Sequence, residues 1–376
     1  MRRRREERLG RPNTPAAAAG LAGMLLLAGC GLGDADGGGD RPPAARPADI
    51  DCARQGRVPG SGSTAQENAM KYWIKQYQQA CPPVRIAYNP LGSGAGVRQF
   101  MQNTTAFGGT DTPVDPREDT PDEGVCERGR VINLPMVGGA VAIGYNVPGV
   151  DDLVLDAATI ARIFDSRITT WDNPAIRKLN PGIELPSLPI RAVHRQDESG
   201  TTQNFQAYLA GAAPDVWSYP AEKAWQGKGG DSAPGSTAVA SAVEETAGAV
   251  GYFELSFAEA RRLKTVRIDT GASAPVAATA QTSSAGIAAA TVVGKGEDLT
   301  LEFDYRTSAD GTYPIVLVSY EIVCDKGNAP ETLPALKSFL TYTASDEGQK
   351  PLAGIHYVPL PEAVAAEVIR VVSTLS

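Results

Sequence analysis

Strand-like runs that end in small-residue turns and lead into helical periodicity recur along this chain, and they restrict it to an α/β fold. In "RIAYNPLGSGAGVRQFMQN", β-branched and aromatic residues precede a glycine-rich turn, and apolar residues at helical spacing follow. This alternation is typical of a sheet whose strands are connected by helices. The 376 residues, 42% of them apolar, are enough for two domains or one large one.

The N-terminus has the pattern of an export signal. A basic segment, "MRRRREERLGR", precedes 14 small and apolar residues, which are too few to span a bilayer. We therefore expect residues 1–29 to be a signal peptide. The sequence Leu27-Ala28-Gly29-Cys30 resembles a bacterial lipobox, in which cleavage precedes Cys30 and the thiol carries lipid. The alternative is an ordinary secretory signal followed by a chance cysteine.

The segment after Cys30 is rich in Gly, Pro and Asp, so we expect residues 30–50 to be a flexible, lipid-anchored linker. The body would then lie outside the cytoplasm, anchored to the outer face of the cell membrane. Residues 1–29 carry six Arg and two Glu, or +4, so cleavage would change the net charge from −8 to −12. An acidic body argues against nucleic acid as a partner.

Four cysteines follow the lipobox, and an even number in an exported protein predicts two disulfides. The sequence does not fix their pairing. We favour Cys52–Cys81, because both residues precede consecutive predicted strands, which leaves Cys126–Cys324. No CxxC pair is present and the chain has two histidines, so we expect neither a zinc site nor another cofactor.

Four stretches combine a strand, a small-residue turn and a helix start. They contain, in order, Thr64, Ser93, Asp111 and the run Ser199-Gly200-Thr201. A helix N-terminus presents unpaired N–H groups and a partial positive charge, which suit an oxyanion. Thr64 and Glu67 also have the spacing of a capping box. One such loop is usually the plain start of a helix, but several of them together with Arg195 and Asp197 favour an anion site.

Rival chemistries find little support. The match of "GSGSTA" to a dinucleotide-binding loop is weak, because no acid follows a clear second strand. The chain has no G-x-S-x-G nucleophile elbow and no GxxxxGK[ST] phosphate loop. His194 lies beside the SGTT run, but we favour a strand-end histidine that faces solvent over a general base. We therefore predict that the protein is not an enzyme.

Together these stretches resemble the periplasmic phosphate-binding protein of the phosphate ABC importer. The similarity runs from about residue 57 to 370 and is closest between Ile160 and Leu209. It implies a two-lobed, type II-like periplasmic binding protein fold, with the ligand in the cleft and crossover strands as the hinge. One lobe would contain residues 51–135 and 315–376, and the other residues 136–314.

The resemblance also implies a set of phosphate-binding residues. They are Thr64, Ala65, Ser93, Asp111, Arg195, Asp197, Ser199, Gly200 and Thr201. Arg195 would bind two ligand oxygens and Asp197 would hold its guanidinium. Two positions depart from the family pattern. Ala65 stands where enterobacterial members usually have an aromatic residue, and Glu198 where glycine is frequent.

The function that these features imply is high-affinity binding of inorganic phosphate by a monomer that delivers it to a membrane permease. Asp111 would select phosphate, because a carboxylate can accept the proton that phosphate keeps and sulfate lacks. Three alternatives stay open. They are a binding protein for sulfate or molybdate, a phosphatase with Thr64 or Ser199 as nucleophile, and a surface lipoprotein without a tight ligand.

Overall fold

The computed structural model describes residues 50–115 and 124–376. The predicted signal peptide 1–29, the lipidated Cys30 and the rest of the linker up to residue 49 lie outside the described residues. The predicted strand "RIAYNPL" is β2, Val84–Pro90, and the helix expected after it is α2, Ser93–Met101. Both follow from local sequence, because alternating burial suits a strand and the glycine-rich turn ends it.

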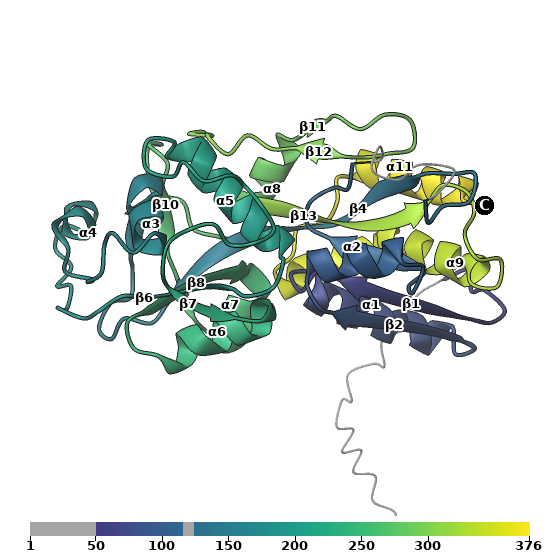
Figure 1. Cartoon of the computed structure of the whole chain (residues 1–376), viewed down its shortest axis with the longest axis horizontal. Coiled ribbons are helices and arrows are strands. Elements are labelled where there is room, and N and C mark those ends of the chain that lie inside the picture. Colours follow the sequence, from purple (N-terminus) through teal and green to yellow (C-terminus); the bar gives the residue numbers. More distant parts are fainter. Residues whose placement is uncertain (1–49, 116–123) are drawn as a thin grey trace, which may run out of the picture. The chain divides into compact units, whose positions relative to one another are not determined.

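The strands form one large mixed sheet, shown in Figure 1, and two small ones. The large sheet has nine strands in the order β2-β1-β3-β13-β4-β8-β6-β7, with β9 paired to β4. The other strand bounds are β1 Gly56–Gly62, β3 Phe107–Thr110, β4 Val131–Tyr145, β6 Arg191–Arg195, β7 Asp231–Ala233, β8 Ala249–Glu254, β9 Lys264–Thr265 and β13 Val316–Cys324. The small sheets pair β5 Val154–Asp156 with β10 Arg267–Asp269, and β11 Thr291–Val292 with β12 Leu301–Glu302.

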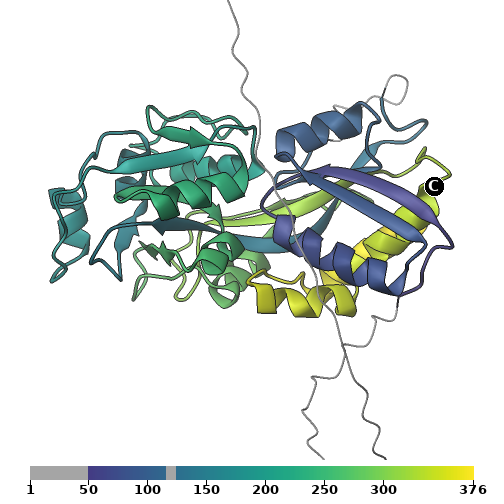
Figure 2. The ribbon, with the colours of Figure 1, turned by 90° about the horizontal axis from the view of Figure 1, so that it is seen from below.

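The helices cover both faces of the sheet. In Figure 2, α2 lies on one face of β1 and β2, and α1 lies on the opposite face. The remaining bounds are α1 Glu67–Ala80, α3 Ala157–Phe164, α4 Pro174–Leu179, α5 Gly200–Ala212, α6 Gly235–Glu245, α7 Leu255–Arg261, α8 Ala280–Ala288, α9 Leu333–Ala344, α10 Asp346–Gln349, the 3₁₀ helix η2 Lys350–Ile355 and α11 Glu362–Thr374. Among the described residues, no helix combines the length and apolar character that a membrane span requires.

The long antiparallel pair β4 and β13 runs between the two lobes (Figure 1), and each end of the pair contributes side chains to a different large hydrophobic core. One core contains side chains of β1, β2, α1, α9 and α11, and the other contains side chains of β6, β8, α3, α5 and α6. Along β4 the core changes between Val137 and Ala140, and along β13 between Tyr320 and Val323. The structure therefore has the predicted two-lobed α/β fold, with β4 and β13 as the crossover strands. The exact lobe boundaries stay a prediction.

The Gly-Gly pair at 138–139 does not interrupt β4, which continues through it. A Cβ atom at Gly139 would lie 3.0 Å from Cγ of Glu254, and one at Gly138 would lie 2.4 Å from Cδ1 of Ile287. The glycines are therefore explained by close packing against neighbouring elements rather than by a turn.

Two local expectations were wrong. Thr64 does not cap α1, because the helix begins at Glu67 with Gln66 at the N-cap and no side-chain cap. The "FGGT" segment before Asp111 is not a turn but strand β3, which pairs with β1 and β13. Thr64 is bonded to Ser236, and "FGGT" is paired with β1 and β13, so in both places residues distant in sequence decide the local structure.

Two disulfides hold the first lobe together, and they are the pairs favoured from the sequence. Cys52 is bonded to Cys81, with 5.5 Å between the Cα atoms, and Cys126 to Cys324, with 5.3 Å. The first bond follows from topology, because Cys52 and Cys81 precede the parallel neighbours β1 and β2. The second attaches the segment before β4 to the end of β13, which constrains the unfolded chain over a sequence separation of 198 residues.

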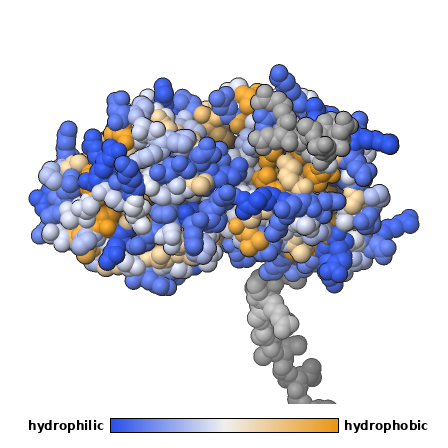
Figure 3. All heavy atoms as spheres, viewed as in Figure 1, coloured by the Kyte–Doolittle hydropathy of each residue, from blue (hydrophilic) through white to orange (hydrophobic). Residues whose placement is uncertain are grey.

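The surface carries few large apolar side chains. The face seen in Figure 3 is mostly hydrophilic, with separate hydrophobic areas. Among the described residues, the exposed large hydrophobic side chains are Leu91, Val292 and Val293. Most of the apolar side chains are thus inside the two cores.

Candidate functional site

Four helix N-termini, two from each lobe, meet in the interior of the molecule. The first two belong to α1 and α2, and the others to α5 and α6. Hydrogen bonds connect them across the lobes: Thr64 Oγ1 lies 2.9 Å from Ser236 Oγ, and Gly200 N donates to Ser93 Oγ at 3.0 Å. Four helix N-termini provide a concentration of N–H groups and partial positive charge. The start of α6 was not among the sequence-predicted anion loops.

Asp111 lies at the centre of these contacts and is 2% exposed. Its Oδ1 accepts hydrogen bonds from the hydroxyl groups of Ser63 and, at 2.7 Å, Ser319, and its Oδ2 accepts one at 3.0 Å from Thr201 Oγ1. Burial raises the pKa of Asp111, while these three hydroxyl donors and the positive charge of Arg195 act to lower it. The carboxylate is thus held by residues of both lobes and by a crossover strand.

Arg195 is the buried cation of the site, with 2% exposure. Its Nε donates to Oδ1 of Asp197 at 2.8 Å, and its Nη2 pairs with Oδ2 of the same carboxylate. The second edge of the guanidinium faces Ser236, whose Oγ lies 3.4 Å from Nη1. One edge is therefore held by the acid, and the other is turned toward the hydroxyl groups that join the lobes.

Asp197 is itself fixed by two interactions. Besides Arg195, its Oδ1 accepts a hydrogen bond from Gly235 N at 2.8 Å, at the start of α6. Burial acts to raise the pKa of Asp197, but the hydrogen bond and charge of Arg195 lower it below the ordinary value. Asp197 therefore stays ionised and orients the guanidinium.

The start of α5 approaches the first lobe closely. A Cβ atom at Gly200 would lie 2.7 Å from Cβ of Asp111 and 2.8 Å from Oγ of Ser93, so a larger residue has no room. The hydroxyl of Ser199 caps α5 by accepting from Thr202 N at 3.2 Å. Ser199 and Thr201 are 1% and 0% exposed. The "SGTT" run thus brings its amide and hydroxyl groups beside Asp111.

All nine predicted ligand residues lie in this region, but two of them are already engaged in ways the sequence did not indicate. The backbone N–H of Ala65 donates to Oγ of Ser63 at 3.0 Å. The hydroxyl of Thr64 accepts from Ser236 N at 3.1 Å, in addition to contacting the Ser236 hydroxyl. Ala65 is fully buried, and the Tyr357 hydroxyl donates to its carbonyl oxygen at 2.6 Å.

Three further residues belong to the site although sequence reasoning missed them. They are Ser63, Ser236 and Ser319. Ser63 and Ser236 could have been found, since Ser63 lies in the small-residue turn between β1 and α1 and Ser236 lies in the first turn of α6, just after β7. Ser319 lies within an apolar strand, and no local signal marks it.

Glu198 and His194 lie at the edge of the site. Glu198 is exposed and forms an ion pair with Arg98 of α2, and its carbonyl oxygen accepts from Gly94 N at 3.0 Å. His194 is half-buried and stacks on Trp225, with 5.1 Å between ring centroids. The expectation that His194 faces solvent was therefore only partly right, because Trp225 covers its ring.

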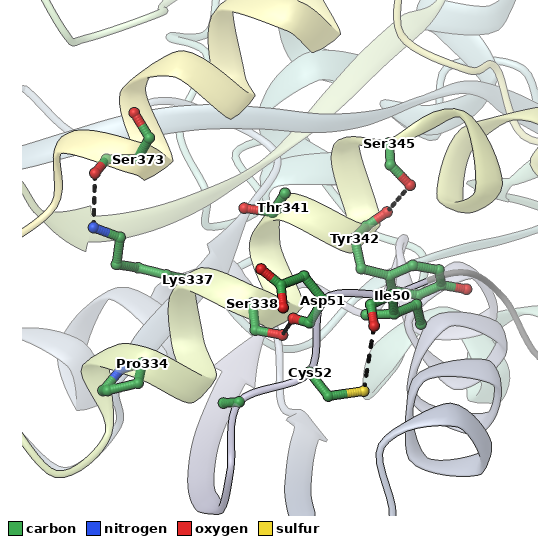
Figure 4. Close-up of a pocket in the computed structure, with 11 residues that line it drawn as sticks. Ile50, Asp51, Cys52, Pro334, Lys337, Ser338, Thr341, Tyr342, Ser345 and Ser373 are labelled. Carbon is green, nitrogen blue, oxygen red and sulfur yellow. Dashed lines mark hydrogen bonds between the residues drawn. The ribbon is translucent and has the colours of Figure 1, made fainter.

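A separate pocket of about 440 Å³ lies where residues 50–53 meet α9 and α11 (Figure 4). Figure 4 shows Ser338 bonded to the Asp51 carbonyl, at 2.6 Å, and Lys337 bonded to the Ser373 carbonyl, at 2.7 Å. The first bond fastens the start of the described chain to α9, and the second joins α9 to α11. None of the nine predicted ligand residues lines this pocket. Within residues 50–115 and 124–376, no group of three His, Cys, Asp or Glu residues is placed to hold a metal ion.

The fold defines the class of protein: a two-lobed, periplasmic-type binding protein. A family model described as a PBP superfamily domain matches residues 47–347. The solved structure of a phosphate-binding protein from Stenotrophomonas maltophilia has a TM-score of 0.63, with 20% identity over 84% of this chain and 93% of that one. At this level of identity the structural similarity concerns the fold.

Two sequence relatives narrow the class. Phosphate-binding protein PstS 3 of Mycobacterium tuberculosis (strain ATCC 25618 / H37Rv) is 40% identical over 94% of this chain and 96% of the relative. PstS 2 of the same strain is 39% identical over the same shares. The chain belongs to the PBP superfamily and, within it, to the family of the phosphate-binding proteins PstS.

Proposed function

We propose that this protein binds inorganic phosphate between its two lobes and delivers it to the permease of an ABC transporter. The observation that carries the proposal is that a buried carboxylate, Asp111, and a buried guanidinium, Arg195, lie in one region among hydroxyl groups from both lobes. The relatives named for phosphate binding support the same ligand.

The donor groups at the site suit a dianion. Arg195 supplies a positive charge, and its free edge has the planar geometry that binds two oxygens. The hydroxyls of Thr64, Ser93 and Ser199 add neutral donors, while the hydroxyl of Thr201 donates to Asp111. A hydrogen bond to a charged group contributes about 1.5 to 3 kcal/mol. Several such bonds reach about −8 kcal/mol, which corresponds to a Kd of ~1 μM.

Selectivity would come from Asp111. Phosphate near neutral pH carries a proton that it can donate to a carboxylate, whereas sulfate carries none. Bound sulfate would have no proton to donate to the carboxylate and would bring its own negative charge against it, which is unfavourable in a buried site. Asp111 therefore rejects fully ionised oxyanions of the same shape.

In this proposal the protein carries the ligand without altering it. Closure of the lobes on phosphate presents a binding-competent surface to the permease, so a shift of the open–closed equilibrium is sufficient. We propose further that the body acts as a monomer outside the cytoplasm, held to the membrane through lipid on Cys30. No catalysis enters the proposal, and incubation with a chromogenic phosphate ester would reveal phosphatase activity if it exists.

Calorimetry on wild type and Asp111→Asn tests the proposal. Wild type should bind phosphate and arsenate tightly and sulfate and molybdate weakly. Asp111→Asn should weaken phosphate binding about 10- to 100-fold, because it loses a charge-assisted hydrogen bond. The gap between phosphate and sulfate should narrow, because an amide can donate to sulfate.

Asp346→Asn is the matched control, since it removes the same charge from an exposed surface pair on α10. It should leave both affinities unchanged. Arg195→Ala should lose most of the affinity at any salt concentration. Equal selectivity in wild type and Asp111→Asn, or tighter binding of sulfate than of phosphate by wild type, would reject the assignment.

A further inference from the structure

Ser319 is the single serine in the apolar strand "VLVSYEIVC", and it is fully buried. A buried hydroxyl group is unfavourable unless it has a hydrogen-bond partner. Its partner is Oδ1 of Asp111, at 2.7 Å. A polar residue in this strand thus reaches the carboxylate of the candidate site.

The sheet explains why these two residues meet. Strands β13 and β3 are antiparallel, and Tyr320 lies opposite Thr110. The next residues along each strand are therefore Ser319 and Asp111, which face each other just beyond the end of the ladder. On its other side β13 pairs with β4, where Ser319 lies opposite Val137 but Tyr320 lies opposite Pro135.

This shift in register makes Met136 an extra residue on β4 and forms a β-bulge beside Ser319. Bulges bend a strand, increase its local twist and accommodate a proline such as Pro135, which has no N–H group to donate. The contact between Ser319 and Asp111 thus lies at the irregular point of the crossover strands, next to the change from one core to the other.

The hydrogen bonds of Asp111 are distributed unequally between its two oxygens. Each carboxylate oxygen has about two acceptor sites. Within residues 50–115 and 124–376, Oδ1 has two donors, the hydroxyls of Ser63 and Ser319, while Oδ2 has one, the hydroxyl of Thr201. Among these described residues, one acceptor site is thus left on Oδ2, the oxygen that faces the start of α5.

We propose that Ser319 is a positioning residue that determines specificity, an inference that rests on the proposed function. Together with Ser63, Ser319 fills both acceptor sites of Asp111 Oδ1, so that Asp111 Oδ2 accepts the proton of the bound phosphate. Ser319 touches no ligand in this scheme and acts through Asp111. It also keeps the carboxylate an acceptor, because its hydroxyl helps to offset the effect of burial on the pKa of Asp111.

Ser319→Val and Ser319→Thr form the test, since the two side chains have nearly the same shape and differ in the hydroxyl group. Calorimetry with inorganic phosphate and sulfate from pH 6 to pH 8 gives the selectivity ratio, which is the dissociation constant for sulfate divided by that for phosphate. Ser319→Val should lower this selectivity ratio about tenfold, the size of one charge-assisted hydrogen bond. It should also change the pH dependence of phosphate binding. Ser319→Thr, which keeps a hydroxyl group, should have the wild-type selectivity and the wild-type pH dependence of phosphate binding.

Ser61→Ala is the matched control. Ser61 is a buried serine of the same sheet, and among the described residues its Oγ has no hydrogen-bond partner. The Ser61→Ala variant should have the same selectivity for phosphate over sulfate as wild type. If wild type itself binds no phosphate, the proposed function fails. If wild type binds phosphate and the folded Ser319→Val variant keeps the wild-type ratio and pH profile, the positioning role is rejected while the proposed function stands.

Discussion

At the scale of single residues, the site brings several acids close to one guanidinium. Asp197 neutralises Arg195 directly, and Asp111 lies close enough for the charge of Arg195 to lower its pKa. Glu254 and Glu321 are also buried, and burial raises the pKa of each, with a further rise from the charge of Asp111. Burial thus opposes the ionisation of these acid groups.

Glu254 illustrates the consequence for stability. Burial raises its pKa to about 8, although its Oε2 accepts a hydrogen bond from Ser256 N at 2.9 Å. The native protein therefore holds a proton on Glu254 between about pH 4.5 and pH 8, where the unfolded chain does not. Its contribution to the free energy of unfolding is full below this window and is lost as the pH rises through it.

We predict that Glu254→Gln flattens this dependence. One pKa unit corresponds to about 1.4 kcal/mol, so the unfolding free energies of wild type and variant should diverge by a few kcal/mol from pH 5 to pH 8, in favour of the variant. Urea unfolding at several pH values measures the difference. Glu331→Gln, an exposed residue just before α9, is the control and should follow wild type. If the free energy of unfolding depended on pH in the same way in Glu254→Gln and wild type, the prediction of a raised pKa for Glu254 would be wrong.

Sequence patterns located several site residues near the turns but missed Ser63, Ser236 and Ser319. Asp111, Arg195 and the "SGTT" run were marked by turns and by a family resemblance, and all three approach one another in the structure. Ser319 carried no local signal, because its position opposite Asp111 depends on the pairing of β13 with β3. The individual ligand roles stay predictions, since they depend on a bound anion.

At the scale of elements, contacts between α2 and the loop before α5 close the edge of the site. Arg98 pairs with Glu198, and both side chains are about half exposed. A Cβ atom at Gly94 would lie 2.5 Å from Cβ of Glu198, so α2 packs directly on this loop. The departure of Glu198 from the family pattern therefore creates an ion pair between the lobes.

We expect Glu198→Gln to speed phosphate release by a few-fold at low salt. An exposed ion pair contributes about 0.2 to 1 kcal/mol, and salt screens it. Stopped-flow measurement of release at about 0.05 M and 0.5 M salt tests this, and the difference between wild type and variant should vanish at high salt. Glu367→Gln, which breaks a similarly exposed pair with Arg370 on α11, should have no effect. Identical release from wild type and Glu198→Gln at low salt would show that the pair does not hold the lobes.

Elements were predicted well where burial follows the helical or strand period. The confirmed expectations include β2 and α2, because their apolar residues recur at the right spacing. The segment 265–312 is rich in Ala, Thr, Ser and Gly, and it contains short strands and one helix, α8. Such short elements depend on their partners rather than on their own periodicity. Thr64 failed as a cap for the related reason that its hydroxyl bonds to Ser236 of the other lobe.

At the scale of the described molecule, each lobe has its own core, and the two share β4 and β13. This arrangement allows the lobes to move about two strands while the site residues stay attached to rigid elements. The cross-lobe bonds of Thr64 and Gly200 are made by residues that we assign to the ligand. A buried phosphate would therefore touch both lobes at once and favour the closed arrangement.

The most direct test is a crystal structure of the protein with inorganic phosphate. We predict that phosphate lies between the lobes, with one oxygen within hydrogen-bond distance of Asp111 Oδ2, others facing the free edge of Arg195, and amide groups from α2 and α5 in contact. Phosphate bound elsewhere, for example in the pocket between residues 50–53 and α9, with Asp111 and Arg195 untouched, would contradict the account.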